Sequence, residues 1–431
     1  MKKLRLLFVL SLITALTPIQ ASAQDAQRAR DMAKDILRIV SSDIEKNYYD
    51  PKFRGLNWKI ETDQARQQIE KANSPGEAFT AIVGLVNKLN DSHTFFIPPQ
   101  RVDQAKFGFW AKPFGDRVMV YKLEKGGAAE KTGLQLGDAL AGMNGFRVDR
   151  DTYDLMMLYF RLMMPVVRLD LKVERDGKLQ PLTVNAIIDK GQKVRDLTGD
   201  GIWDLIREEQ SADAKADKFL YNRLPGDVGY VSIPEFSVDS EFLTRLLKKI
   251  EGSKAVIVDL RNNPGGYTES LASLASHFQE QEGSMADIIT RKKTEPVKIK
   301  GRQPLFTGPL YVLVDAHSMS SSEMFAQHFQ SLKRATVIGD HTMGRVNAAR
   351  IFDEKIGLDT IVPFTVEISV GRVVFPGGVE LEGKGISPDE LCIPTAKELH
   401  DKQDHCFSLA LKMAQKALAY NPEPAKAEAN K

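Results

Sequence analysis

The serine-rich turn around residue 320 is the first feature of the chain that offers nucleophilic chemistry. It runs from His317 to Glu323, after the apolar residues 310–314 and before a helical pattern. Ser320 and Glu323 have the spacing of a capping box, so one interpretation is that these serines only cap a helix. The other is a serine nucleophile at a helix N-terminus, where N–H groups and the helix dipole stabilise an oxyanion. Both interpretations can hold for different serines of the run.

A nucleophilic serine needs a general base, and the chain has seven histidines. His93 lies in Asp-Ser-His-Thr at residues 91–94, between a helical pattern and the apolar residues 95–97. A single histidine in such a turn is more often structural than catalytic. His341 is a competitor, and His317 is close to Ser320 in sequence but is expected on the incoming strand. The residues alone leave the choice of base open.

A second strand-to-helix turn, at residues 259–266, reads Asp-Leu-Arg-Asn-Asn-Pro-Gly-Gly. Paired glycines let a backbone approach a substrate closely and direct its N–H groups outward. The alternative is a loop that merely needs positive φ. Because ligands usually bind at the carboxyl ends of strands in open α/β sheets, we place the candidate site at these two turns.

Alternating strands and helices are predicted to position both turns. Between residues 225 and 400, strands are predicted at 228–233, 255–260 and 310–314, and helices at 241–250, 267–278 and 323–332. This alternation predicts an α/β layer structure. Residues 105–186 read as short strands with a hairpin turn at Asn144-Gly145 and a helix at 151–164. Residues 25–90 read as amphipathic helices.

The composition is that of a globular protein with two or three domains. The chain has 431 residues, of which 42% are hydrophobic and 27% charged, which excludes a fibrous or disordered chain. Lys and Arg number 59 against 57 Asp and Glu, a near-balance that argues against nucleic acid as a partner. No metal-ligand cluster or nucleotide loop stands out, so we expect no metal and no cofactor.

The first 23 residues have the pattern of a secretory signal peptide. Basic residues at 2, 3 and 5 precede an apolar run at 6–16, and Ala-Ser-Ala follows at 21–23. The apolar run is shorter than the ~20 residues of a membrane-spanning helix. With cleavage after Ala23, we expect a periplasmic or secreted protein without a membrane span. In that oxidising setting Cys392 and Cys406, the only cysteines, are expected to form a disulfide rather than two buried thiols.

Four ordered motifs between Asp259 and Asp389 resemble those of the C-terminal processing peptidase family, the tail-specific and tricorn-core serine proteases. They are Asp-Leu-Arg-x-Asn-Pro-Gly-Gly, Ser-x-Ser-x-Ser-Glu, Val-Ile-Gly-Asp-x-Thr-x-Gly and Glu-Gly-Lys-Gly-Ile-x-Pro-Asp. The resemblance implies a multi-domain α/β (α+β) chain with a crotonase/ClpP-like peptidase core that cleaves polypeptides. It places the nucleophile at Ser320.

Where many members of that family carry a catalytic lysine, this chain has Arg345. A guanidinium stays protonated and cannot act as a general base, so a Ser–Lys dyad is not available there. The tricorn-like branch instead uses a serine and a histidine from an N-terminal segment and a late glutamate. The resemblance assigns these roles to Ser92, His93 and Glu382, with Glu380 as the alternate glutamate.

The resemblance implies that His93 takes the proton of Ser320 as the serine attacks a peptide carbonyl. Glu382, directly or through Ser92, would then support the imidazole. It further implies an oxyanion hole, a charged substrate contact and a carboxylate-binding loop of an inserted PDZ domain that recruits or gates substrate C-termini. Gly266 and Ser321 would form the oxyanion hole, and Arg345 would make the substrate contact. The carboxylate-binding loop would consist of Phe107, Gly108, Phe109 and Trp110. The alternative for the last group is a purely structural β-module.

The expected organisation therefore has six parts. They are a signal peptide (1–23), a helical segment (24–103), a PDZ-like domain (104–188), a connector (189–224) with a helix at 201–210, a serine peptidase core (225–415) and a disordered tail (421–431). The pattern of the helical segment is compatible both with a homo-oligomer and with packing within one chain.

Two other functions fit the same scaffold. One is a catalytically inactive peptide- or ligand-binding protein, since a fold does not determine function; the retained Ser-His-Glu set argues against it. The other is an acyl hydrolase of small esters, against which the PDZ-like module favours a polypeptide substrate.

Overall fold

The computed structural model describes residues 23–99, 103–160, 166–190, 219–302, 306–357 and 361–420. The predicted signal peptide up to residue 22, the connector helix at 201–210 and the predicted tail at 421–431 lie outside these ranges. Within them the chain folds as a mixed α/β protein with N-terminal helices, antiparallel sheets and a largely parallel sheet.

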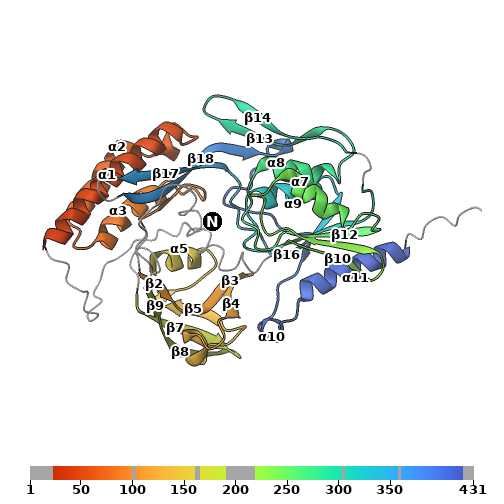
Figure 1. The fold of residues 1–431 in the computed structure, drawn as a ribbon, viewed down its shortest axis with the longest axis horizontal. Helices are drawn as coiled ribbons and strands as arrows, with labels where there is room; N and C mark the ends of the chain where they lie inside the picture. The colour runs from red at the N-terminus through yellow and green to blue at the C-terminus, as the bar shows by residue number, and fades with distance from the viewer. Residues whose placement is uncertain are drawn as a thin grey trace, which may run out of the picture.

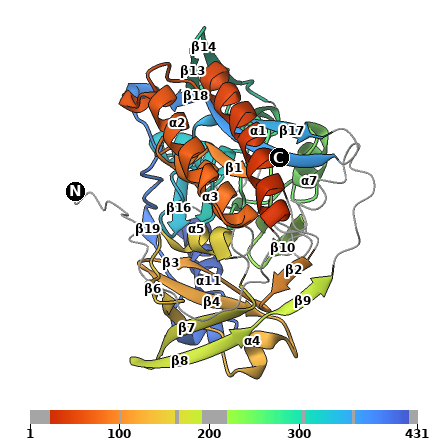
Figure 2. The same ribbon diagram turned by 90° about the vertical axis from the view of Figure 1, so that its left-hand side faces the viewer.

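Three N-terminal helices form the first layer: α1 (Ala23–Asn47), α2 (Trp58–Glu70) and α3 (Pro75–Asn87). Side-chain caps explain where two of them begin, because Asn57 accepts from the amide of Ile60 and Ser74 accepts from the amide of Glu77. The predicted helical pattern of residues 25–90 is confirmed. The apolar faces of the three helices pack on an antiparallel sheet (Figures 1 and 2).

That sheet joins segments that are distant in sequence. Its order is β1-β18-β13-β14, with β17 also paired to β18. The strands are β1 (Phe95–Ile97), β13 (Gly283–Thr290), β14 (Thr294–Ile299), β17 (Ala348–Ile356) and β18 (Val362–Val374). Phe95 lies opposite Glu367, so the turn that carries His93 is brought beside a strand from the far end of the sequence.

A β-rich module lies beneath this layer (Figure 2). Its main sheet has the order β3-β4-β5-β7-β8, β6 pairs with β5, and β2 pairs with β9. The elements are β2 (Asp103–Lys106), β3 (Phe109–Phe114), β4 (Arg117–Leu123), α4 (Ala128–Lys131), β5 (Ala139–Met143), β6 (Phe146–Arg147), α5 (Tyr153–Leu158), β7 (Arg168–Arg175), β8 (Lys178–Asn185) and β9 (Ile187–Lys190). The hairpin turn at Asn144-Gly145 is confirmed, with both residues at positive φ. Of the helix expected at 151–164 the structure describes α5, and residues 161–164 lie outside the described ranges.

The third unit has a sheet of order β10-β11-β12-β15-β16-β19, parallel except for β10. Its strands are β10 (Leu220–Leu224), β11 (Val228–Ser232), β12 (Ala255–Asp259), β15 (Leu310–Val314), β16 (Ala335–Gly339) and β19 (Glu390–Leu391). Helices α7 (Ser240–Lys248), α8 (Thr268–Ser276) and α9 (Ser321–Ser331) cover one face, and α11 (His405–Tyr420) covers the other. Val258 and Val312 point to the first face, while Ile257 and Leu313 point to the second, as strand alternation requires.

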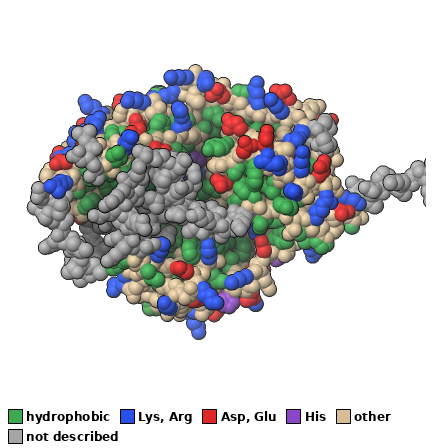
Figure 3. Space-filling view, in the orientation of Figure 1, with side chains coloured by type: hydrophobic (Ala, Val, Ile, Leu, Met, Phe, Trp, Pro, Cys, Tyr) green, Lys and Arg blue, Asp and Glu red, His purple; other side chains and the backbone are tan. Residues whose placement is uncertain are grey.

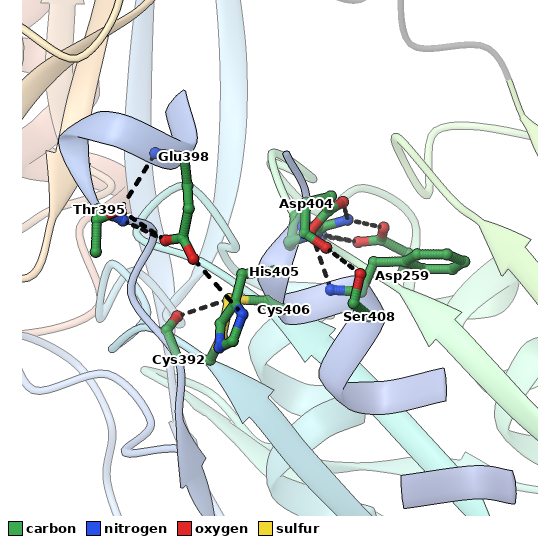
Figure 4. Close-up of a disulfide and its surroundings, with 10 residues drawn as sticks. Asp259, Cys392, Thr395, Glu398, Asp404, His405, Cys406 and Ser408 are labelled. Carbon is green, nitrogen blue, oxygen red and sulfur yellow. Dashed lines mark hydrogen bonds and ion pairs between the residues drawn. A yellow bond between two sulfur atoms is a disulfide. The ribbon is translucent and has the colours of Figure 1, made fainter. Parts of the chain in front are cut away.

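The predicted disulfide between Cys392 and Cys406 is confirmed (Figure 4). It joins the residue after β19 to the start of α11. Asp404, at the same helix end, holds the Arg261 guanidinium at 2.7 and 2.8 Å, and Arg261 also binds Asp259 at the end of β12. The crosslink closes a short loop, a constraint that contributes on the order of 3 kcal/mol to stability.

Acidic and basic side chains are interspersed over the face drawn in Figure 3, consistent with the near-zero net charge. None of the helices among the described residues has the length and apolar character needed to cross a bilayer.

Candidate active site

Ser320 occupies the sharp turn between β15 and α9. Its backbone has φ 52° and ψ −116°, a conformation that costs a non-glycine residue strain and persists only where the surroundings enforce it. Two acceptors do so: its N–H donates to the Arg345 carbonyl at 2.6 Å and to the Glu323 carboxylate at 3.1 Å. The glutamate half of the predicted capping box, the bond from the Ser320 amide to the Glu323 carboxylate, is therefore present. A strand-to-helix turn of this kind presents its side chain at the sheet edge.

The neighbouring serines have structural tasks. Ser318, Ser321 and Ser322 donate their hydroxyl protons to the carbonyls of Leu260, Gly266 and Asn263, at 2.8, 2.8 and 3.1 Å. These bonds attach the β15–α9 turn to the β12–α8 turn. Among the described residues, the Ser320 hydroxyl donates to no such carbonyl, so it is the hydroxyl left for chemistry.

The paired glycines at 265 and 266 are required by close backbone approach. A Cβ on Gly265 would lie 2.7 Å from the Cβ of Ser320, and one on Gly266 would lie 2.3 Å from the amide nitrogen of Ser237. Both glycines also have positive φ. The amides of Gly266 and Ser321 donate to no acceptor within the described ranges, which leaves two N–H groups beside Ser320.

The turn that carries His93 is organised by Asp91. One carboxylate oxygen of Asp91 accepts from the His93 amide at 3.1 Å and from the Thr94 hydroxyl at 3.2 Å. It also accepts from the hydroxyl of Ser369 on β18, and the other oxygen accepts from Tyr48. His93 itself is buried. The backbone at His93 is thus held beside β18.

Glu382 lies against this turn although it is 290 residues from Ser92 in sequence. Its Oε1 accepts from the Ser92 amide at 3.1 Å and from the Ser92 hydroxyl at 2.5 Å. Its Oε2 lies 3.9 Å from Nδ1 of His93. Burial opposes ionisation, but the His93 ring and the Ser92 hydroxyl lower the pKa of Glu382 to about 2. The carboxylate is therefore ionised at neutral pH.

Residues 342–347 connect the nucleophile turn to this carboxylate. The carbonyl of Arg345 binds the Ser320 amide, and the next two amides, of Val346 and Asn347, each donate to Glu382 at 3.0 Å. The segment thus brings the predicted catalytic residues into one region. Within the described residues no hydrogen bond joins the Ser320 hydroxyl to the His93 ring; catalytic bonds are often long before a substrate binds.

Glu323 is a positioning residue that the sequence indicated only as a helix cap. Its fully buried carboxylate accepts four hydrogen bonds, from Thr342 Oγ1 (2.5 Å), Gly344 N (2.8 Å), Arg345 N (3.0 Å) and Ser320 N (3.1 Å). It therefore holds both the nucleophile turn and the 342–347 segment. Burial raises the pKa of Glu323 to about 7 despite these donors.

We expect Glu323→Gln to lower kcat by about ten- to a hundredfold, because the amide NH2 would face N–H donors and leave them unpaired. Steady-state peptidase assays would measure this. The matched control is Glu269→Gln, an exposed glutamate in the first turn of α8, which should be neutral; equal losses in both variants would refute the role.

The same substitution has a pH signature. Because the folded pKa of Glu323 is raised, the folded state binds this proton more tightly than the unfolded state, and stability falls as pH rises from about 4.5 to about 7. Urea unfolding across that window should show a weaker pH dependence in Glu323→Gln than in the wild type.

The other candidates for the general base and for the supporting glutamate lie elsewhere or have other partners. Glu380 forms an ion pair with Arg372 at 3.0 Å. His341 is exposed, and its amide donates to Asp340. His317 lies in the loop after β15, not on the incoming strand as expected, because β15 ends at Val314; its Nε2 is 3.7 Å from Asp154 of α5.

Arg345, expected to contact substrate, directs its guanidinium to the ring of Phe95, 5.3 Å from the centroid. Its Nε is buried and has no hydrogen-bond partner. Among the described residues no carboxylate lies within ion-pair distance of the Arg345 guanidinium. The expected contact of Arg345 with substrate beside Ser320 stays a prediction.

The predicted carboxylate-binding loop begins β3. The side chains of Phe107 and Phe109 are buried in the module, Gly108 has φ 73°, and Trp110 stacks with Lys122 at 4.4 Å. The aromatic rings of Phe107 and Phe109 thus belong to the core of the module, while Trp110 is half-buried. Within the described strands β3 is the end strand of its sheet.

Sequence reasoning missed the contacts between the β-module and the catalytic turns. Lys112 of β3 is buried and places its ammonium 2.5 Å from Asp315 and 2.6 Å from Asn262. Arg150 binds Asp340 at 3.0 Å in a second contact. Asp315 directly follows β15, and Asp340 directly follows β16. This position at a strand end was the only signal in the sequence that could have indicated the two contacts. In the part of the chain described, no three His, Cys, Asp or Glu side chains group as a metal site.

Comparison with known proteins yields a family profile, two relatives and one solved structure. Residues 227–392 match the profile described as Peptidase family S41. Over 378 residues the chain is 24% identical to carboxyl-terminal-processing peptidase 1, chloroplastic, of Arabidopsis thaliana, covering 83% of this chain and 71% of the relative. It is 24% identical over 386 residues to a probable CtpA-like serine protease of Staphylococcus aureus, covering 82% and 70%. The crystal structure of mature CPAF has a similar fold, with a TM-score of 0.66 at 16% identity over 91% of this chain and 98% of that one.

Proposed function

We propose that this chain, a serine-type peptidase of family S41, cleaves polypeptides through an acyl-enzyme formed on Ser320. The observation that carries the proposal is the placement of Ser320: it alone of the four serines at 318–322 keeps a hydroxyl outside the loop's carbonyl bonds, on a strained strand-to-helix turn. Strain held at one turn by surrounding bonds is typical of a functional residue.

In this mechanism His93 accepts the Ser320 proton and returns it to the leaving amine. Glu382 stabilises the imidazolium that forms, and its lowered pKa supports this role because the group stays charged. Ser92 lies between the two, since its hydroxyl binds Glu382 and lies 3.4 Å from Nδ1 of His93. The amides of Gly266 and Ser321 would bind the oxyanion, a role for which their unoccupied N–H groups suit them.

We further propose that the catalytic core has a crotonase/ClpP-like architecture and that the β-module is a PDZ-like domain that recruits or gates substrate C-termini. One feature supports the second point: among the described strands β3 is the end strand of its sheet, and an extended peptide can add to such an edge. Arg345 would contact the bound polypeptide near Ser320. Export through the N-terminal signal remains our proposal for location, and the disulfide is compatible with it.

Labelling with a fluorophosphonate probe tests the nucleophile. We expect one adduct, which peptide mass spectrometry should locate on Ser320. An adduct on Ser318, Ser321 or Ser322 would assign the nucleophile elsewhere. Absence of any adduct in a folded protein would favour a catalytically inactive binding protein.

Binding of matched peptides tests the PDZ-like role. A peptide with a free C-terminus should bind the Ser320→Ala protein at least about tenfold more tightly than its C-terminal amide, because charged groups make the stronger hydrogen bonds. Fluorescence anisotropy measures both affinities. Equal affinities would indicate that the module is structural.

A further inference from the structure

A small polar pocket has Glu382 as one of its lining residues. Its volume is about 240 Å3, and its walls include Arg54, Arg372, Lys384 and Asn347 as well as Glu380 and Glu382. Arg54 belongs to the turn after α1, Arg372 to β18, and Lys384 to the loop that carries Glu382. Residues 49–54 and residues 347–384, which are distant in sequence, therefore meet around one cavity. The cavity is smaller than the ~300–1,000 Å3 of pockets for drug-sized ligands.

The positive charges of this pocket exceed the carboxylates that are free to balance them. Arg372 is paired with Glu380 at 3.0 Å. The Glu382 carboxylate is occupied by Ser92 and by two backbone amides. Arg54 donates to the backbone carbonyls of Leu89 and Asn90.

The remaining cation, Lys384, reaches only the Glu380 carbonyl, at 3.4 Å. Within the described residues, neither Arg54 nor Lys384 lies within ion-pair distance of a carboxylate. Two cations thus line the cavity without a counter-ion from the protein, and the side-chain amide of Asn347 adds a neutral donor because its oxygen accepts from Val373.

We propose that this pocket binds a small oxyanion, a carboxylate or a phosphate group, between Arg54 and Lys384. Guanidinium and ammonium groups donate charge-assisted hydrogen bonds to such oxygens. The proposal concerns binding alone and does not depend on the peptidase chemistry of Ser320.

The position of the pocket gives such a ligand access to the catalytic region. Arg54 holds the two carbonyls that precede the Asp91–His93 turn, and Lys384 is two residues from Glu382. An anion bound to both Arg54 and Lys384 would link the segment that carries His93 to the segment that carries Glu382. Because it binds the folded state, it should also raise Tm in a concentration-dependent way.

Isothermal titration of the full-length Ser320→Ala protein tests the proposal at constant ionic strength. One arm uses inorganic phosphate; the other compares an N-acetylated amino acid with its amide. We expect saturable binding of phosphate or of the free carboxylate, and no binding of the amide. Phosphate binding indicates a free-anion site, whereas binding of the carboxylate alone indicates a site for a peptide end.

Two matched variants locate the binding. Lys384→Gln should weaken it by about tenfold or more, the loss of one charged hydrogen bond, while Lys300→Gln, an exposed lysine directly after β14, should leave it unchanged. The proposal is overturned if neither anion binds, if Lys384→Gln binds as the wild-type pocket does, or if both lysine variants weaken binding equally. Peptidase failure would leave these outcomes unaffected.

Discussion

Replacing Ser320 with alanine is expected to lower kcat on a polypeptide substrate by ~10⁴- to 10⁶-fold, the range found when a serine nucleophile is removed. The expected loss is this large because no other hydroxyl can take over: those of Ser318, Ser321 and Ser322 are bound to carbonyls of the β12–α8 turn. Hydrolysis of a fluorogenic peptide measures the change. Residual turnover would come from the amides of Gly266 and Ser321.

Ser322→Ala is the matched control, since it removes one serine hydroxyl from the same turn and leaves Ser320 in place. It should retain activity to within about tenfold. A double variant, Ser320→Ala with His93→Ala, should be no less active than either single variant, because a base without a nucleophile contributes nothing further. Additive losses would show that His93 acts elsewhere, and equal losses in Ser320→Ala and Ser322→Ala would remove Ser320 from its proposed role.

The sequence was sufficient to predict the local elements of this site. Short apolar runs predicted the strands β11, β12 and β15, the glycine pair indicated a close approach, and the Ser320–Glu323 spacing marked the start of α9. These features depend on residues near one another in the chain. The crosslink between Cys392 and Cys406 was predictable on another ground, because they are the only two cysteines of a chain that we expect to be exported.

Long-range pairing was not predictable in the same way. His93 reaches the core because Phe95 pairs with Glu367 across β1 and β18, and nothing in either segment specifies the other. The resemblance to a family supplied Glu382, whereas the bonds from Val346 and Asn347 that hold it became visible only in the structure.

The buried Lys112–Asp315 pair is the clearest omission. A lysine in a short strand normally faces solvent, so the sequence offered no reason to place it in the interior. In the structure its ammonium lies over Phe114 and Tyr121, at 5.3 and 5.1 Å, and reaches across to the turn before Ser320. The β-module is therefore fastened to the catalytic unit by a buried charge.

We expect Lys112→Met to lower the free energy of unfolding by about 3–5 kcal/mol, the cost of leaving a buried carboxylate without its partner. Asp315 would keep its bonds from the amides of Asn262 and His317 but lose the ammonium at 2.5 Å. Urea unfolding measures the change. Lys172→Met, an exposed lysine on β7, should change stability by less than about 0.5 kcal/mol.

A second substitution separates the charge from the packing. Asp315→Asn in the Lys112→Met background removes the unpaired charge while its amide oxygen still accepts from Asn262 and His317, so the double variant should recover most of the lost stability. Lys112 holds the pKa of Asp315 well below its ordinary value although burial opposes this. The carboxylate therefore contributes stability above that ordinary pKa that is lost as pH falls, and Asp315→Asn should remove this acid sensitivity. If Lys112→Met is as stable as Lys172→Met, the Lys112–Asp315 pair does not fasten the two units, and their contact depends on the Arg150–Asp340 pair and on packing.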